Sequence, residues 1–177
     1  MSEPAERIVL VGFMGSGKST VGRLVARRLG YAFEDMDGRI EARAGRTIVT
    51  IFHDDGEEAF RALEREEARS LVGLPHCVVA AGGGAFARPE TRALLQHGAV
   101  TVWLRCDLAT ALARIPADGA RPLASNRDIM APLLAEREPT YRMADVAVDA
   151  SGAPEQVADR VVALVRGRLR GEAAAGR

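Results

Sequence analysis

The residues best suited to chemistry lie in segment 12–20, which has the sequence Gly-Phe-Met-Gly-Ser-Gly-Lys-Ser-Thr. It matches G-x-x-x-x-G-K-[ST], a pattern typical of loops whose backbone N–H groups surround phosphate oxygens. Lys18 is the only lysine of a chain in which every other basic residue is arginine. Its compact ammonium group suits the β- and γ-phosphates of a nucleotide better than a planar guanidinium does. The alternative is a tight strand-to-helix turn that binds nothing.

The same loop predicts the groups that would hold a nucleotide and its metal ion. Glycines let successive N–H groups converge on phosphate oxygens, and the N-terminus of the following helix adds a favourable dipole. The hydroxyl of Ser19 is expected to ligate Mg²⁺. We predict that six consecutive residues bind the nucleotide: Gly15, Ser16, Gly17, Lys18, Ser19 and Thr20. This pattern predicts binding and leaves the reaction open.

Two carboxylates follow the second predicted strand. Asp35 and Asp37 are two residues apart, so on a continuing strand their side chains would point the same way. Ligands gather at the carboxyl ends of the strands in open parallel sheets, which would place both groups near the phosphates. One could then hold a water on Mg²⁺ while the other accepts a hydroxyl proton. The alternative is that Asp37 caps the following helix.

Two further groups of residues suit a small acidic substrate. Arg61 and Glu64 are three apart on a predicted helix and can form an ion pair. The pair could be structural, or Glu64 could orient Arg61 to bind a substrate carboxylate through two hydrogen bonds. The rest of segment 57–69 is expected to be a solvated helix face. The three glycines at 82–84 follow a buried strand, where either close approach of a ligand or a tight turn would explain them.

Short apolar runs and helical periodicity predict the frame that positions these groups. Strands are expected at 7–11, 32–36, 77–81, 100–104 and 145–148. Helices are expected after the glycine loop up to Gly30, within 38–72 with breaks near Gly45 and Gly56, and at 89–97, 108–115, 129–138 and 154–169. The alternation predicts an α/β sandwich of three layers, in which helices cover both faces of a parallel five-stranded sheet.

Length and composition indicate one domain over residues 1–177, with a loop at 116–126 and a frayed tail at about 171–177. The 24 acidic residues balance the 24 basic ones, so no net charge favours nucleic acid or an anionic membrane. No apolar run suggests a signal peptide or a membrane span, and we expect a cytoplasmic monomer. The histidines and cysteines have no spacing typical of a metal site.

Six motifs occur in order: Gly-x-Met-Gly-Ser-Gly-Lys-Ser-Thr, Asp35-x-Asp37, Phe60-Arg61-x-x-Glu64, Gly82-Gly83-Gly84, Arg121-Pro122-Leu123 and Arg137-x-x-x-Tyr141. Together they resemble the shikimate kinase family over residues from about 8 to 169. The resemblance implies a fold like that of nucleoside monophosphate kinases. It also implies transfer of the γ-phosphoryl group of MgATP to the 3-hydroxyl of shikimate, a step of aromatic amino acid (chorismate) biosynthesis.

The resemblance further implies a role for each residue on the acceptor side. Asp37 would contact the hydroxyls of shikimate and act as the base, while Asp35 would support Mg²⁺. Arg61 and Arg137 would hold the substrate carboxylate, and Gly82, Gly83 and Gly84 would line the same pocket. Four apolar residues would surround the substrate ring: Phe52, Phe60, Pro122 and Leu123.

The remaining implied roles concern the nucleotide. Arg114 would lie against adenine. Segment 116–126 would form a lid whose Arg121 closes on the phosphates, completing a catalytic set with Lys18 and Asp37. Such a lid would also exclude water, which would otherwise hydrolyse ATP.

Two rival hypotheses stay open at this point. The chain could phosphorylate another small hydroxy acid or a nucleoside monophosphate, although Asp37, Arg61 and Arg137 favour a carboxylated polyol. It could instead be a nucleotide-binding module that no longer catalyses, although the complete catalytic set argues against this.

Overall fold

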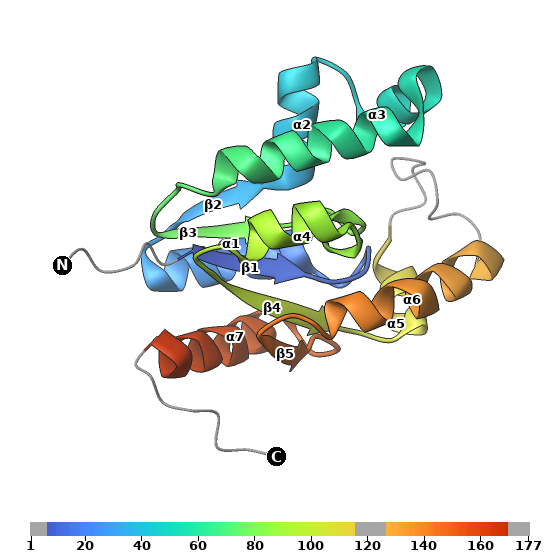
Figure 1. Cartoon of the computed structure of the whole chain (residues 1–177). Helices are drawn as coiled ribbons and strands as arrows, with labels where there is room; N and C mark the ends of the chain where they lie inside the picture. The colour runs from blue at the N-terminus through green and yellow to red at the C-terminus, as the bar shows by residue number, and fades with distance from the viewer. Residues whose placement is uncertain (1–6, 116–126, 170–177) are drawn as a thin grey trace.

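A sheet of five parallel strands forms the centre of the computed structural model, which describes residues 7–115 and 127–169 (Figure 1). The strands are β1 Arg7–Val11, β2 Ala32–Asp35, β3 Cys77–Ala80, β4 Ala99–Arg105 and β5 Val146–Asp149. They lie in the order β2-β3-β1-β4-β5, and every neighbouring pair is parallel. The predicted α/β fold with a parallel five-stranded sheet is therefore confirmed.

Helices connect the strands and cover the sheet on both faces (Figure 1). They are α1 Lys18–Leu29, α2 Met36–Ala44, α3 Ile48–Leu71, α4 Pro89–Gln96, α5 Leu108–Arg114, α6 Arg127–Tyr141 and α7 Pro154–Leu169, with a 3-10 turn, η1, at Ala85–Ala87. Helices α1 and α7 pack together on one face, while α3, α4 and α6 contribute to the core of the other.

Strand β1 shows why a helical layer is needed on each side. All five of its residues are buried. Ile8 and Leu10 pack with α1 and α7, whereas Val9 and Val11 belong to the core beside α3, α4 and α6. Successive side chains of a strand point to opposite faces, so an unbroken apolar run suits a strand that is covered on both sides.

Several predicted boundaries differ from the structure by one to three residues, and two of these differences concern elements that carry site residues. The strand predicted at 32–36 ends at Asp35, because α2 begins directly at Met36. Helix α6 is longer than the predicted 129–138 at both ends, and it contains Pro132 and Pro139. Tertiary packing of α6 on the core, through its buried residues Met130, Arg137 and Tyr141, outweighs the low helix propensity of the prolines.

The predicted breaks in the long helical region are present. Gly45 ends α2 with a φ of 64° and a backbone N–H that donates to the carbonyl of Glu41. Gly56 interrupts the helical geometry of α3 with a φ of 83°. The region is therefore a bent pair of helices that stands beside the edge strand β2 (Figure 1).

The carboxyl ends of the parallel strands share one edge of the sheet, and candidate residues follow three of them. The glycine loop follows β1, Asp35 ends β2, and the glycines at 82–84 follow β3. The predicted lid at 116–126, with Arg121, Pro122 and Leu123, lies outside the described residues. Across 7–115 and 127–169, no helix combines the length and the apolar character needed to cross a membrane.

Candidate functional site

The glycine loop between β1 and α1 has a shape that favours glycine at three positions, Gly12, Gly15 and Gly17. Gly15 has a φ of 78° and Gly17 a φ of 92°, both in the left-handed region. A Cβ atom on Gly15 would also lie 2.4 Å from the carbonyl oxygen of Ala111 in α5. Helix α1 starts without a side-chain cap and without an acidic residue in its first turn. Its positive N-terminal dipole is therefore directed at the loop, an arrangement that favours anions.

Lys18 points back across this loop. Its Nζ donates to the carbonyl oxygens of Gly12 at 2.7 Å and of Phe13 at 2.9 Å, and it lies 3.5 Å from Ser16 Oγ. The residue is only 9% exposed. The ammonium group is thus confined by the backbone that would surround the phosphates of a nucleotide.

A cavity of about 350 Å³ adjoins the loop and is lined by Gly15, Gly17, Lys18, Ser19, Thr20, Val21, Arg114, Ala150, Gly152, Pro154 and Val157. It brings together all the predicted nucleotide-binding residues of the described chain except Ser16, which is buried beneath the loop. The walls from 150–157 were missed by sequence reasoning. They belong to the connection between β5 and α7 and to the first turn of α7, which carry no motif and reach the loop only through the fold.

Arg114 joins the two sides of this cavity. Its Nη1 donates to the carbonyl oxygen of Ser16 at 3.5 Å, and its Nη2 donates to those of Ser151 and Gly152 at 3.3 Å each. The guanidinium plane therefore lies between the glycine loop and the start of α7. A flat aromatic base could stack on such a plane.

A second cavity, of about 390 Å³, lies on the other side of Ser19. It is lined by Met14, Ser19, Asp35, Asp37, Gly38, Glu41, Ile48, Phe52, Phe60, Arg61, Glu64, Ala80, Ala81, Gly83, Gly84 and Arg137. Ser19 borders both cavities, so the two meet at the first turn of α1. Among the described residues, the structure thus brings every predicted acceptor residue except Gly82 to a single cavity beside the phosphate loop.

The two aspartates reach this cavity by a route different from the predicted one. Asp35 is the N-cap of α2, where its Oδ1 accepts from the N–H of Gly38 at 3.3 Å, and Asp37 lies in the first helical turn. The expectation that both aspartates share one face of a strand is therefore wrong, because the strand ends between them. The alternative that Asp37 is the cap is also wrong. Oδ2 of Asp35 accepts from the hydroxyl of Ser19 at 2.7 Å, which links β2 to the phosphate loop.

Arg61 and Glu64 form the predicted ion pair, and it is buried. Nη1 of Arg61 lies 2.8 Å from Oε1 of Glu64, whose side chain is 1% exposed. Burial raises the pKa of Glu64, and the positive charge of Arg61 opposes this increase. Glu57 contacts the outer side of the same guanidinium at 3.4 Å. Glu64 therefore orients the guanidinium of Arg61 at the cavity wall, and the pair is not a solvent-exposed surface pair.

Close packing of charged side chains explains two of the three glycines. A Cβ atom on Gly82 would lie 2.8 Å from Oε2 of Glu64 and 2.9 Å from Oδ1 of Asp37. One on Gly84 would lie 2.6 Å from both Nη atoms of Arg61. Neither glycine has a positive φ. The glycines also form a tight turn, in which the N–H of Ala85 donates to the carbonyl oxygen of Gly82 at 3.1 Å, but the approach of cavity side chains is what leaves no room for a Cβ atom at Gly82 and Gly84.

Helix α6 supplies the opposite wall. Arg137 is 8% exposed, and its guanidinium lies 6.0 Å from the ring of Phe13 in the glycine loop. One turn later, the hydroxyl of the buried Tyr141 donates to the carbonyl oxygen of Gly83 at 2.5 Å. Burial raises the pKa of Tyr141 to about 12, so this donor keeps its proton at neutral pH. Tyr141 therefore ties α6, and Arg137 with it, to the glycine turn.

The chain matches known proteins over most of its length. The family model described as shikimate kinase matches residues 14–166. A shikimate kinase of Geobacter sulfurreducens is 44% identical over 172 residues, which are 94% of this chain and 95% of that protein. A shikimate kinase of Caulobacter vibrioides is 45% identical over 157 residues, covering 87% of this chain and 78% of that protein.

Solved structures agree with these matches. The shikimate kinase of Acinetobacter baumannii in complex with shikimate has a TM-score of 0.89 and 34% identity, covering 94% of this chain and 96% of that one. A gluconokinase of Sinorhizobium meliloti has a TM-score of 0.60 at 19% identity over 96% of this chain and 97% of that one, which shows the shared fold alone. On the family model and the identities to its members, the chain belongs to the shikimate kinase family.

Proposed function

We propose that the protein transfers the γ-phosphoryl group of MgATP to the 3-hydroxyl of shikimate. The observation that carries this proposal is the meeting of two cavities at Ser19, one formed by a phosphate loop and the other by arginines and carboxylates. The active unit is proposed to be the monomer.

The acceptor cavity suits a carboxylic acid that carries hydroxyl groups. Arg61 and Arg137 offer guanidinium donors from α3 and α6, and guanidinium binds carboxylates through paired hydrogen bonds. Asp37 offers an acceptor for hydroxyl groups. Phe52 and Phe60 pack with ring centroids 4.7 Å apart and provide an apolar wall for a carbon ring. A nucleoside base would offer these arginines no carboxylate to bind.

The reaction needs positioning and charge neutralisation more than covalent help. The hydroxyl oxygen forms a bond to the γ-phosphorus, the bond from that phosphorus to the bridging oxygen breaks, and ADP leaves. Asp37 accepts the proton that the hydroxyl loses. Lys18 stabilises the negative charge that develops on the phosphoryl oxygens. Arg121 is proposed to assist from a lid that lies outside the described residues.

A divalent cation fits beside Ser19. The hydroxyl of Ser19 and the carboxylate of Asp35, 2.7 Å apart, are hard oxygen ligands of the kind that Mg²⁺ prefers. Within the described ranges, no cluster of three or more His, Cys, Asp or Glu could hold a metal unaided. Mg²⁺ is commonly bound by few protein oxygens together with substrate phosphates, as these two residues would require. When bound, it would neutralise phosphate charge during transfer.

Asp35→Asn separates the proposed metal role from the structural one, because asparagine also caps helices well. We expect the Mg²⁺ concentration for half-maximal activity to rise about 10-fold or more, as for other residues that support metal ligands. The KM for shikimate should change little. Titrating Mg²⁺ at saturating ATP and shikimate measures this, and circular dichroism shows whether α2 persists. An unchanged Mg²⁺ requirement would remove Asp35 from the metal site.

Gly84→Ala tests the close contact between the glycine turn and Arg61. The added methyl group must displace the guanidinium from a position 2.6 Å away. We expect the KM for shikimate to rise roughly 10-fold, about 1.4 kcal/mol of binding, with little change in the KM for ATP. Gly73→Ala is the matched control, since no atom lies within 4 Å of its added Cβ. Equal effects of the two substitutions would count against the proposed clamp.

A substrate panel tests the proposed function against its rivals. ADP release from MgATP is followed with shikimate, gluconate, a nucleoside monophosphate or no acceptor. We expect ADP release from MgATP only in the reaction that contains shikimate. Turnover with gluconate or a nucleotide but not with shikimate would assign a different acceptor. No ADP with any acceptor, although ATP binds, would favour the nucleotide-binding module.

A further inference from the structure

The acceptor cavity depends on how two helices are placed relative to each other. Helix α2 contributes Asp37, whereas α3 contributes Arg61 and Glu64. A shift of α2 relative to α3 would therefore separate the group that meets hydroxyls from the group that meets the carboxylate. Misplacement of catalytic and binding groups by about 1 Å is enough to lower rates substantially.

At the cavity, the two helices bring like charges together. Oδ1 of Asp37 and Oε2 of Glu64 lie 2.9 and 2.8 Å from the same point, the position of a Cβ atom on Gly82. Burial raises the pKa of Glu64 most, while the charge and the hydrogen bond of Arg61 lower it. The negative charge of Asp37 makes a smaller contribution that raises it. Two carboxylates this close repel each other, and burial of one of them, Glu64, strengthens the effect. Arg61 pairs with Glu64 and offsets part of this repulsion, so the approach of the two carboxylates does not by itself hold α2 against α3.

One turn farther along α3, the charges are opposite. Glu67 follows Glu64 by three residues, and its side chain is only 1% exposed. Its Oε1 accepts from Nε of Arg39, and its Oε2 accepts from Nη1 of Arg43 at 3.1 Å. Both arginines come from α2, one helical turn apart. Each oxygen of one buried carboxylate is thus held by a different arginine of the neighbouring helix.

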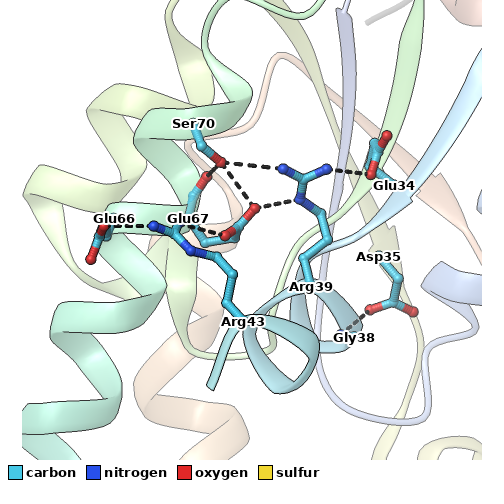
Figure 2. A network of polar contacts seen from close by, with 8 residues as sticks. All are labelled: Glu34, Asp35, Gly38, Arg39, Arg43, Glu66, Glu67 and Ser70. Atoms are coloured by element: carbon cyan, nitrogen blue, oxygen red, sulfur yellow. Dashed lines mark hydrogen bonds and ion pairs between the residues drawn. The ribbon is translucent and has the colours of Figure 1, made fainter. Parts of the chain in front are cut away.

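Neighbouring groups orient these arginines. Nη1 of Arg39 donates to Glu34 of β2 at 2.7 Å, which connects the network to the sheet (Figure 2). The hydroxyl of Ser70 donates to Oε1 of Glu67 at 2.9 Å. Burial works against the charged form of Glu67, but the hydrogen bonds from Arg39 and Arg43 outweigh it and lower its pKa. Glu67 therefore stays ionised and bound to α2.

The ion pair between Arg43 and Glu66, at the outer side of the network, is exposed to solvent. Arg43 also pairs with Glu66 at 2.7 Å, but the two side chains are 53% and 55% exposed. Exposed pairs contribute little, because water and salt screen them. A buried carboxylate with two arginine partners is different, since removing its charge removes the one buried acidic partner that Arg39 and Arg43 share. The two adjacent glutamates thus differ in burial while sharing Arg43.

We propose that Glu67 is a positioning residue of the acceptor site. Its attachment to Arg39 and Arg43 holds α2 against α3 and opposes the repulsion between Asp37 and Glu64. The distance between the hydroxyl-binding and carboxylate-binding groups is set by this balance. The inference rests on the proposed function, because it assigns those groups to shikimate. It adds a residue that touches no ligand, since Glu67 does not line the cavity.

Glu67→Gln tests this inference, because it keeps the shape of the side chain and removes its charge. We expect the KM for shikimate to rise roughly 10-fold, with the KM for ATP unchanged within about twofold. A merely structural role would instead lower the amount of active enzyme, without separating the two KM values. Glu66→Gln is the matched control and should behave as the wild type. Arg39→Lys keeps the positive charge but loses the planar guanidinium, which donates to both Glu67 and Glu34. It should raise the KM for shikimate by a smaller factor.

Two results would overturn the inference: a wild-type KM for shikimate in folded Glu67→Gln, or equal increases in both KM values. Should Glu67→Gln fail to fold, Arg39→Lys decides by the same criterion. Amide hydrogen exchange of α2 gives a readout that needs no substrate: exchange should accelerate in Glu67→Gln and not in Glu66→Gln. If the wild type does not phosphorylate shikimate, the proposed function fails. The exchange experiment then still supports or refutes the attachment of α2 by Glu67.

Discussion

Asp37→Asn is expected to lower the turnover number by about a thousandfold, within the range that general-base catalysis contributes. Asparagine has nearly the same shape and can still accept a hydrogen bond, but it cannot take the proton of the attacking hydroxyl. The residue lies in the first turn of α2 and borders the cavity at Ser19. Since α2 is capped by Asp35 and not by Asp37, the substitution leaves the start of the helix intact.

This prediction is specific because Asp37→Asn should lower turnover without weakening ATP binding. ATP affinity, measured by calorimetry, should remain within a few fold of the wild type, because Asp37 does not line the nucleotide cavity. Asp159→Asn on the surface of α7, with a side chain 71% exposed, is the matched control and should retain full activity. Turnover at the wild-type rate in Asp37→Asn would show that no proton transfer depends on this carboxylate.

Lys18→Arg should lower turnover by about 10² to 10³, as removal of a group that stabilises transition-state charge does in other enzymes. The substitution preserves the positive charge, so charge alone cannot account for such a loss. The ammonium group of Lys18 lies within 2.9 Å of two loop carbonyls, and the residue is only 9% exposed. A planar guanidinium is wider and presents its donors in a fixed fork, so it cannot occupy this position without moving the loop.

The exposed arginines of α1 provide the control for this exchange. Arg27→Lys, in the last turn of the helix, should leave activity unchanged. Single-turnover kinetics at saturating MgATP separate the chemical step from nucleotide binding. An active Lys18→Arg enzyme would mean that any cation serves in the loop, and that lysine persists there for no chemical reason.

The fold was largely predictable, because its strands are short apolar runs between clear helical signals. A parallel sheet buried on both faces requires such runs, as β1 illustrates. The predicted boundaries were wrong where packing or the start of the next element outweighed the local sequence pattern. No loop residue separates β2 from α2 around Asp35 and Asp37. The sequence pattern therefore did not indicate that the helix already begins at Met36.

The candidate site was predictable where a motif has a fixed local geometry. The loop residues and the pair of Arg61 and Glu64 are of this kind. Glu67 was not, because segment 57–69 alternates charges in a way typical of a solvated helix face. Its burial results from contact with α2, and spacing along α3 alone contains no information about that neighbour. The walls of the nucleotide cavity near Gly152 were missed for the same reason.

The most direct test of the proposed reaction is identification of its products. Purified protein is incubated with MgATP and shikimate, and phosphorus and proton nuclear magnetic resonance follow both products over time. The account predicts ADP and shikimate phosphorylated at its 3-hydroxyl, formed in equal amounts, with little ADP when shikimate is omitted. Phosphorylation at another hydroxyl, or ADP formed with inorganic phosphate in place of a phosphorylated acid, would contradict it.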